Sequence, residues 1–127
     1  MPEKHVFEYA VIRVVPRVER EEFINVGVIL FCKRTKFLQC IIKVDDDRLS
    51  AFAAGLDIVE VKSNLHAFAE ITAGNKTCGS IAALDEASRF RWLTATRSTV
   101  VQTSKVHPGL TDDCEKTLRR LFAEMVA

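Results

Sequence analysis

One short stretch in the second half of the chain carries the densest group of side chains suited to holding a ligand. Arg97 and Ser98 precede a strand-like run, Gln102 lies within it, and His107 follows it. An arginine suits a carboxylate or a phosphate, and a histidine transfers protons near neutral pH. This group is the first candidate ligand site, with His107 as the candidate catalytic residue. The structural alternative is that Arg97 binds carbonyl groups at a helix end and that His107 lies in a turn.

A second candidate lies in the apolar run INVGVILFCK, residues 24–33. Asn25 alternates onto the face opposite the apolar row, and Gly27 lies beside it on that face. A polar side chain next to a glycine is typical of a place where a ligand approaches the backbone. A β-bulge at the glycine explains the same pattern without a ligand.

Three consecutive carboxylates, Asp45, Asp46 and Asp47, follow a strand-like run. Carboxylates at a strand end bind Mg²⁺ in many phosphate-processing enzymes. No second acidic group in the sequence points at the triplet, and acidic residues directly before a helix cap its amides and complement its dipole. The sequence therefore favours a helix cap over a metal site.

The four cysteines are Cys32, Cys40, Cys78 and Cys114, and no two of them form a C-x-x-C pair. Cysteine is among the most buried residue types, and a zinc site needs clustered ligands. The pattern predicts buried, reduced thiols. We expect neither a bound metal nor a cofactor.

Composition and charge narrow the function classes. The chain has 127 residues, 48% of them hydrophobic, and 18 Lys and Arg against 17 Asp and Glu give a net charge of +1. This balance is typical of one globular domain, which we place over residues 1–127. A near-neutral chain argues against general electrostatic capture of nucleic acid. No signal peptide is visible and the apolar runs are short, so we expect a cytoplasmic protein.

The first half of the sequence predicts three strands. Phe7–Val15 has two apolar faces, with Arg13 as the exception on its face, and Phe37–Val44 alternates cleanly. Between them, Ile24–Lys33 predicts a strand, joined to the third by a short turn at residues 34–35 and forming an antiparallel meander with both neighbours. Its even-numbered residues are expected to share one face: Ile24, Val26, Val28, Leu30 and Cys32.

The second half is predominantly helical. Capping and apolar spacing predict helices over residues 48–54, 58–73, 85–95 and 113–126, with Asp112 in the capping position of the last. A fourth strand is predicted over residues 98–106 and is ended by the turn residues His107, Pro108 and Gly109. Strands first and helices after predict an α+β fold: a mostly antiparallel sheet of about four strands, a meander plus one late strand, with helices packed on it.

Two stretches of the sequence resemble one known family. The first runs from Tyr9 to Phe31 and includes YAVIR and EFINVGVILF, and the second runs from Arg89 to Gly109 and includes RFRWL and RSTVVQ. In order, spacing and residue type they are similar to the small bacterial family called domain of unknown function 3037. The resemblance extends over nearly the whole chain, and the middle third is its least distinctive part.

The resemblance implies a set of site residues but no mechanism. Carried over position by position, the polar signature of the family falls on Glu22, Asn25, Arg97, Ser98, Gln102 and His107. Members of the family are neighbours, in bacterial genomes, of proteins that resemble HipA-type kinases. That association implies a protein partner of this kind. If the first, second and fourth strands lie close together, these six residues share one pocket.

Three functions remain open from the sequence. The favoured one is a non-enzymatic binding or regulatory module that contacts a protein partner or a small anionic ligand, because no catalytic constellation is present. The second is a small enzyme for a phosphate- or nucleotide-containing substrate, in which Arg97 and Ser98 hold the anion and His107 transfers protons. The third is nucleic-acid binding through Arg13, Arg17, Arg20, Arg89 and Arg91, which the net charge of +1 disfavours.

Overall fold

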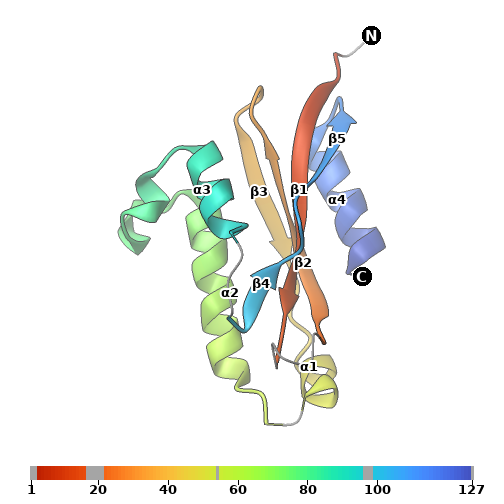
Figure 1. The fold of residues 1–127 in the computed structure, drawn as a ribbon, viewed down its shortest axis with the longest axis vertical. Coiled ribbons are helices and arrows are strands. Elements are labelled where there is room, and N and C mark those ends of the chain that lie inside the picture. Colours follow the sequence, from red (N-terminus) through yellow and green to blue (C-terminus); the bar gives the residue numbers. More distant parts are fainter. Residues whose placement is uncertain (1–2, 17–21, 54, 96–98, 127) are drawn as a thin grey trace.

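A computed structural model describes residues 3–16, 22–53, 55–95 and 99–126. Its central element is a five-stranded antiparallel sheet with helices on both faces, so the predicted α+β class is confirmed (Figure 1). The strands are β1 His5–Val14, β2 Ile24–Cys32, β3 Phe37–Ile42, β4 Val101–Thr103 and β5 His107–Thr111. The helices are α1 Asp46–Phe52, α2 Ile58–Ala73, α3 Glu86–Leu93 and α4 Cys114–Met125, with short 3₁₀ turns at Lys76–Cys78 and Ile81–Ala83.

The predicted meander is present as β1, β2 and β3, and the late strand is divided in two. The strand order is β3–β2–β1–β4, and β5 pairs with the same edge of β1 further along it. Ser104 lies at the break between β4 and β5. Its Oγ accepts the Val11 N–H at 2.9 Å, and its own N–H donates to the Val11 carbonyl at 2.8 Å. A side chain thus replaces one backbone acceptor of the ladder, which interrupts the strand without unpairing β1.

The turn predicted at His107, Pro108 and Gly109 is wrong, because these residues form the first part of β5. Proline is tolerated there since β5 lies at an edge of the sheet. Gly109 pairs with Phe7, and a Cβ atom added at Gly109 would lie 2.5 Å from the Phe7 ring. The glycine is therefore required by the close approach of a ring and not by a turn.

A β-bulge in β2 corrects the predicted face assignment of that strand. Ile12 pairs with Gly27 and Arg13 with Asn25, so Val26 is an extra residue on β2. The even-numbered residues before the bulge contact one core, whereas Val28 and those after it contact the other. The predicted bulge is therefore confirmed. A Cβ atom at Gly27 would lie 2.5 Å from the Ile41 carbonyl oxygen, so the glycine also lets β3 approach closely, while the approach of a ligand stays a prediction.

The two faces of the sheet carry cores of different size. Within the described residues, sixteen buried apolar residues form the core between the sheet and α1, α2 and α3. Seven form the core beneath α4, which packs on β2 and β3 on the opposite face. Figure 1 shows α2 and α3 on one side of the strands and α4 on the other. We call these the α2 face and the α4 face.

Aspartate caps begin all four α-helices of the described residues. Asp45, Asp57, Asp85 and Asp113 each accept the N–H of the residue three positions later, at 2.8–3.1 Å. The predicted cap of the acidic triplet is therefore confirmed, while the cap of α4 is Asp113 and not Asp112. In the described part of the chain, no helix has both the length and the apolar character needed to cross a membrane.

Candidate functional site

Three polar side chains lie in one row across the sheet. Arg13 on β1 pairs with Asn25 on β2 and with Gln102 on β4, so the three residues are neighbours on three adjacent strands. Directly opposite residues of a sheet point to the same face. Because Ile12 and Val14 point into the larger core, this row points to the α4 face. We call it the polar row.

Arg13 has an unusual environment for a charged residue. Its side chain is half-buried, and the Nε atom is buried with no hydrogen-bond partner among the described residues. The guanidinium carbon lies 3.8 Å from the centroid of the Phe23 ring, which is a cation–π contact. Burial lowers the pKa of Arg13, although a guanidinium keeps its charge at neutral pH. The site thus holds a cation with at least one buried donor, the Arg13 Nε atom, that no described residue accepts from.

The side-chain amide of Asn25 makes one hydrogen bond within the described residues and leaves its oxygen without a partner there. Its Nδ2 donates to the carbonyl of Met125 at 3.1 Å, which satisfies a carbonyl at the C-terminal end of α4. Its Oδ1 is buried and has no hydrogen-bond partner within the described ranges. Asn25 therefore fixes the end of α4 and still presents an acceptor beside Arg13.

Gln102 and His107 share the α4 face but lie apart along it. The Nε2 atom of Gln102 donates to the Thr99 carbonyl at 2.7 Å, which orders the chain before β4. His107 is exposed and pairs with Tyr9, and the two rings are 5.4 Å apart. Arg13 lies four positions after Tyr9 on β1, which corresponds to roughly 13 Å along an extended strand. The polar row and His107 are therefore separate places on one face.

The other predicted site residues complete the comparison. Glu22 is exposed and lies two residues before β2 begins. Arg97 and Ser98 fall outside the described residues. Of the residues predicted to share one pocket, Asn25 and Gln102 lie in the same row of the sheet. His107 lies further along the sheet, and Glu22 lies just before the start of β2.

A cavity adjoins the polar row at the end of the sheet near α1. It has a volume of about 470 Å³ and is lined by Phe23, Ile24, Asn25, Arg48, Ala51 and Phe52. Two of its phenylalanines are unusually open to solvent, Phe23 at 44% and Phe52 at 37%. Arg48 lines the cavity, and Arg13 stands over the ring of its lining residue Phe23, so basic groups and apolar rings are neighbours there. This chemistry fits an anionic group attached to an apolar or flat part.

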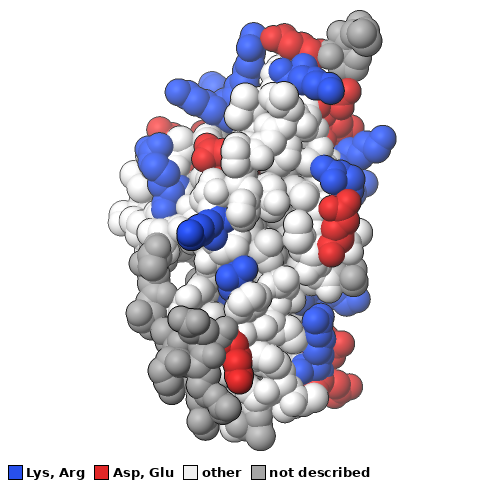
Figure 2. All heavy atoms as spheres, turned by 45° about the vertical axis from the view of Figure 1, so that its right-hand side comes forward, with Lys and Arg blue, Asp and Glu red and all other residues white. Residues whose placement is uncertain are grey.

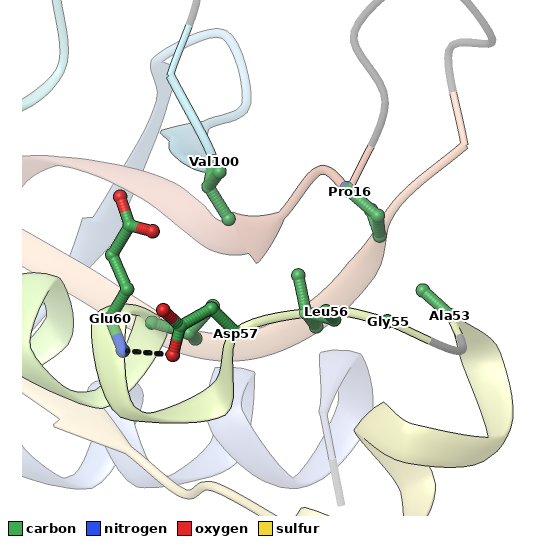
Figure 3. Close-up of a pocket in the computed structure, with 8 residues that line it drawn as sticks. Pro16, Ala53, Gly55, Leu56, Asp57, Glu60 and Val100 are labelled. Carbon is green, nitrogen blue, oxygen red and sulfur yellow. Dashed lines mark hydrogen bonds between the residues drawn. The ribbon is translucent and has the colours of Figure 1, made fainter.

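A second cavity, shown in Figure 3, has the opposite charge. It has a volume of about 310 Å³, lies between β1, β4 and the start of α2, and its charged lining residues are Asp57 and Glu60. The Asp57 carboxylate accepts the Glu60 N–H at 3.1 Å and so serves as the cap of α2. An anion is disfavoured between these two carboxylates. Of the two cavities, the one beside the polar row is therefore better suited to an anion.

Figure 2 shows the side of the molecule that carries β5 and α4, where basic and acidic side chains are scattered over a largely uncharged area.

The sequence match decides the family. A family described as a protein of unknown function, DUF3037, matches residues 9–126. The chain belongs to this family. No curated protein and no solved structure matches the chain. Membership in DUF3037 confirms the resemblance found in the sequence and carries no stated activity.

Sequence reasoning missed the central residue of this site. The sequence predicts Arg13 as the exception on one apolar face of its strand and as a candidate for nucleic-acid binding, but not as a partner of Asn25 and Gln102. Its isolation within an apolar run was the available signal. The sequence contains no such signal for Arg48 and Phe52, because only the tertiary structure places α1 beside the start of β2.

Proposed function

We propose that this DUF3037 protein is a non-enzymatic binding module of the bacterial cytoplasm that holds an anionic group on its α4 face. Arg13 receives the carboxylate or phosphate, Asn25 accepts a hydrogen bond from the same ligand, and Phe23 contacts its apolar part. The observation that supports this is the pair of buried, unfilled polar atoms in neighbouring positions, Arg13 Nε and Asn25 Oδ1. Buried polar groups are ordinarily paired, so unfilled ones mark a place for a ligand.

The chemistry of the two atoms narrows the ligand. Arg13 offers a donor and Asn25 an acceptor, so the ligand must supply an anionic acceptor together with an N–H or O–H donor. An acidic peptide segment of a protein partner supplies both, and so does a small hydroxy- or amino-acid. The association with HipA-type kinases makes such a kinase the first partner to test.

The enzymatic alternative receives less support from the geometry. A general acid or base must lie within hydrogen-bond reach of the reacting group. His107 lies roughly 13 Å along β1 from the position of Arg13, at the ordinary rise of a strand. An anion held by Arg13 is therefore out of reach of His107.

The first experiment is a thermal-shift screen of the purified chain against phosphates, nucleotides, hydroxy acids and amino acids. A ligand at 100 times its dissociation constant adds about 2.7 kcal/mol to the free energy of unfolding. Each kcal/mol raises the melting temperature of a chain of this size by roughly 3–5 °C. We expect Arg13→Met to abolish the shift of any hit.

The control variant is Arg119→Met. Arg119 is an exposed arginine on α4 whose guanidinium donates a hydrogen bond to Glu115 at 2.6 Å. It does not belong to the polar row or to the lining of the adjoining cavity. A shift that survives Arg13→Met but is lost in Arg119→Met contradicts the proposal. A parallel pull-down with the neighbouring HipA-type kinase, using the same three proteins, tests the partner form of the ligand.

A further inference from the structure

Two cysteines far apart in the sequence meet beneath the first turn of α4. Cys32 is the last residue of β2 and Cys114 is the first residue of α4, and both belong to the smaller core. Both are free thiols, with exposed fractions of 0% and 9%. The end of β2 and the beginning of α4 thus lie side by side, and each carries a thiol.

Thr35 connects the two thiols. It lies in the four-residue loop between β2 and β3, and its Oγ1 is 3.8 Å from Cys114 Sγ. Burial raises the pKa of Cys32, but hydrogen bonds from Thr35, from Cys114 and from the Arg34 backbone outweigh it, so the pKa lies below its ordinary value. These hydrogen bonds favour a thiolate at one end of the pair.

The second thiol responds in the opposite direction. Burial raises the pKa of Cys114, and the neighbouring Cys32 and Asp113 raise it further, against the Thr35 hydroxyl. Two interacting thiols lose their protons in steps that belong to the pair. Cys32 is therefore favoured to lose its proton first, and the remaining proton lies in the hydrogen bond between the two sulfur atoms.

A small molecule can reach this place. A cavity of about 330 Å³ is lined by Cys114 and Thr35, together with His5, Phe37 and three acidic residues of the α4 start. The cavity admits a molecule of the size of a hydroperoxide to Cys114, whereas Cys32 lies behind it. Cys40, by contrast, belongs to the other core, and burial raises its pKa.

We propose that Cys32 and Cys114 form a redox-active dithiol that a hydroperoxide converts to a disulfide. The proton shared by the pair passes from Cys114 to Cys32, and the Cys114 thiolate so formed attacks a peroxide oxygen. An S–O bond forms, the O–O bond breaks, and the alkoxide or hydroxide leaves and takes up a proton from water. Cys32 then attacks the sulfenic sulfur, the S–S bond forms, and hydroxide leaves as water with the remaining thiol proton. In sum, two thiols and ROOH give one disulfide, ROH and water.

The bond has a structural consequence. It ties the start of α4 to the end of β2 and closes a loop that contains β3, β4, β5 and the helices of the α2 face. A disulfide that closes so long a loop restricts the unfolded chain strongly. Oxidation thus locks the helix that lies beside the polar row.

The test uses the reduced full-length protein and hydrogen peroxide. We expect the intact mass to fall by two hydrogen atoms and a non-reducing peptide map to show the Cys32 peptide joined to the Cys114 peptide. The matched controls are Cys40→Ser and Cys78→Ser, which should leave the product and its rate unchanged. Thr35→Val, which removes the hydroxyl and keeps the shape, should slow the reaction several-fold.

The peptide map of the unaltered protein decides the proposal even if a cysteine variant does not fold. A disulfide that joins any other pair overturns it, and so does separate oxidation of Cys32 and Cys114 to sulfinic or sulfonic acids. An unchanged mass at peroxide concentrations that oxidise free cysteine overturns it as well.

Discussion

The two faces of the sheet differ in what their residues do. On the α2 face, sixteen buried apolar residues of the described ranges form the core between the sheet and three helices. On the α4 face, seven do so beneath one helix, and the polar row, His107 and the Cys32–Cys114 pair lie on this face or at its end. The α2 face therefore buries more apolar residues, and we expect it to contribute more to stability. The α4 face is covered in part, so the polar row is half-buried and His107 is exposed.

The largest effect is expected from the two glycines that let the strands pack. An alanine at Gly27 would place its Cβ 2.5 Å from a backbone carbonyl, which cannot move without breaking the β2–β3 pairing. An alanine at Gly109 meets the Phe7 ring, a side chain that can turn. We expect Gly27→Ala to cost about 3 kcal/mol or more and Gly109→Ala less, measured by urea unfolding. If both substitutions lower the free energy of unfolding equally, the Phe7 ring does not turn away more easily than the Ile41 carbonyl, which contradicts the prediction.

Matched leucines compare the two cores directly. Leu65 of α2 is 3% exposed and Leu118 of α4 is 2% exposed, so the two have the same chemistry and burial. Leucine-to-alanine changes in cores cost about 2–5 kcal/mol, depending on how far the site can close. Within this range we expect Leu65→Ala to cost more than Leu118→Ala, because α4 alone can move to close a cavity more easily than three helices that are packed together. A larger loss for Leu118→Ala would show that the α4 face carries the stability.

Arg13→Met should separate stability from binding. The variant keeps the alkyl chain and removes a partly desolvated charge, at the expense of the cation–π contact with Phe23. We expect the free energy of unfolding to stay within about 1 kcal/mol of the unaltered protein, because these contributions oppose each other. Chemical unfolding without ligand measures it. A loss of several kcal/mol would make Arg13 a structural residue and would withdraw support from the proposed site.

The smallest effect concerns the α2 face and depends on pH. Hydrogen bonds from Ser88 lower the pKa of Asp85, the cap of α3. A lowered folded-state pKa stabilises the fold above the ordinary carboxyl pKa, and this contribution is lost as the pH falls through the folded value. Asp85→Asn keeps a capping side chain without the charge. We expect the unaltered protein to be the more stable near neutral pH and the two to converge in acid, by thermal unfolding at several pH values. A difference that is independent of pH contradicts this.

Local sequence was sufficient for most of the elements. The caps of α2, Asp57 and Gly74, follow from spacing alone, because capping and helical periodicity depend on near neighbours. The apolar stripe of α4 was predicted for the same reason, and all of its members contact the smaller core. The break at Ser104 and the strand at His107 were not predicted, since both depend on pairing with β1, a strand some ninety residues earlier.

The candidate site was predicted only in part. Sequence and family resemblance selected Asn25 and Gln102, and whether they bind a ligand stays a prediction. The choice of Arg13 required the register of β1 with β2 and β4, which places three residues from distant parts of the chain in one row.

The sequence by itself determined the α+β class, the ends of α2 and the family, because these depend on composition, local spacing and residue identity. The tertiary structure decided which residues share a face. One extra residue at the Gly27 bulge reverses the direction of every side chain after it in β2, since strand side chains alternate with a period of two. That reversal sends Cys32 to the α4 face, where it meets Cys114, and no local pattern contains that information.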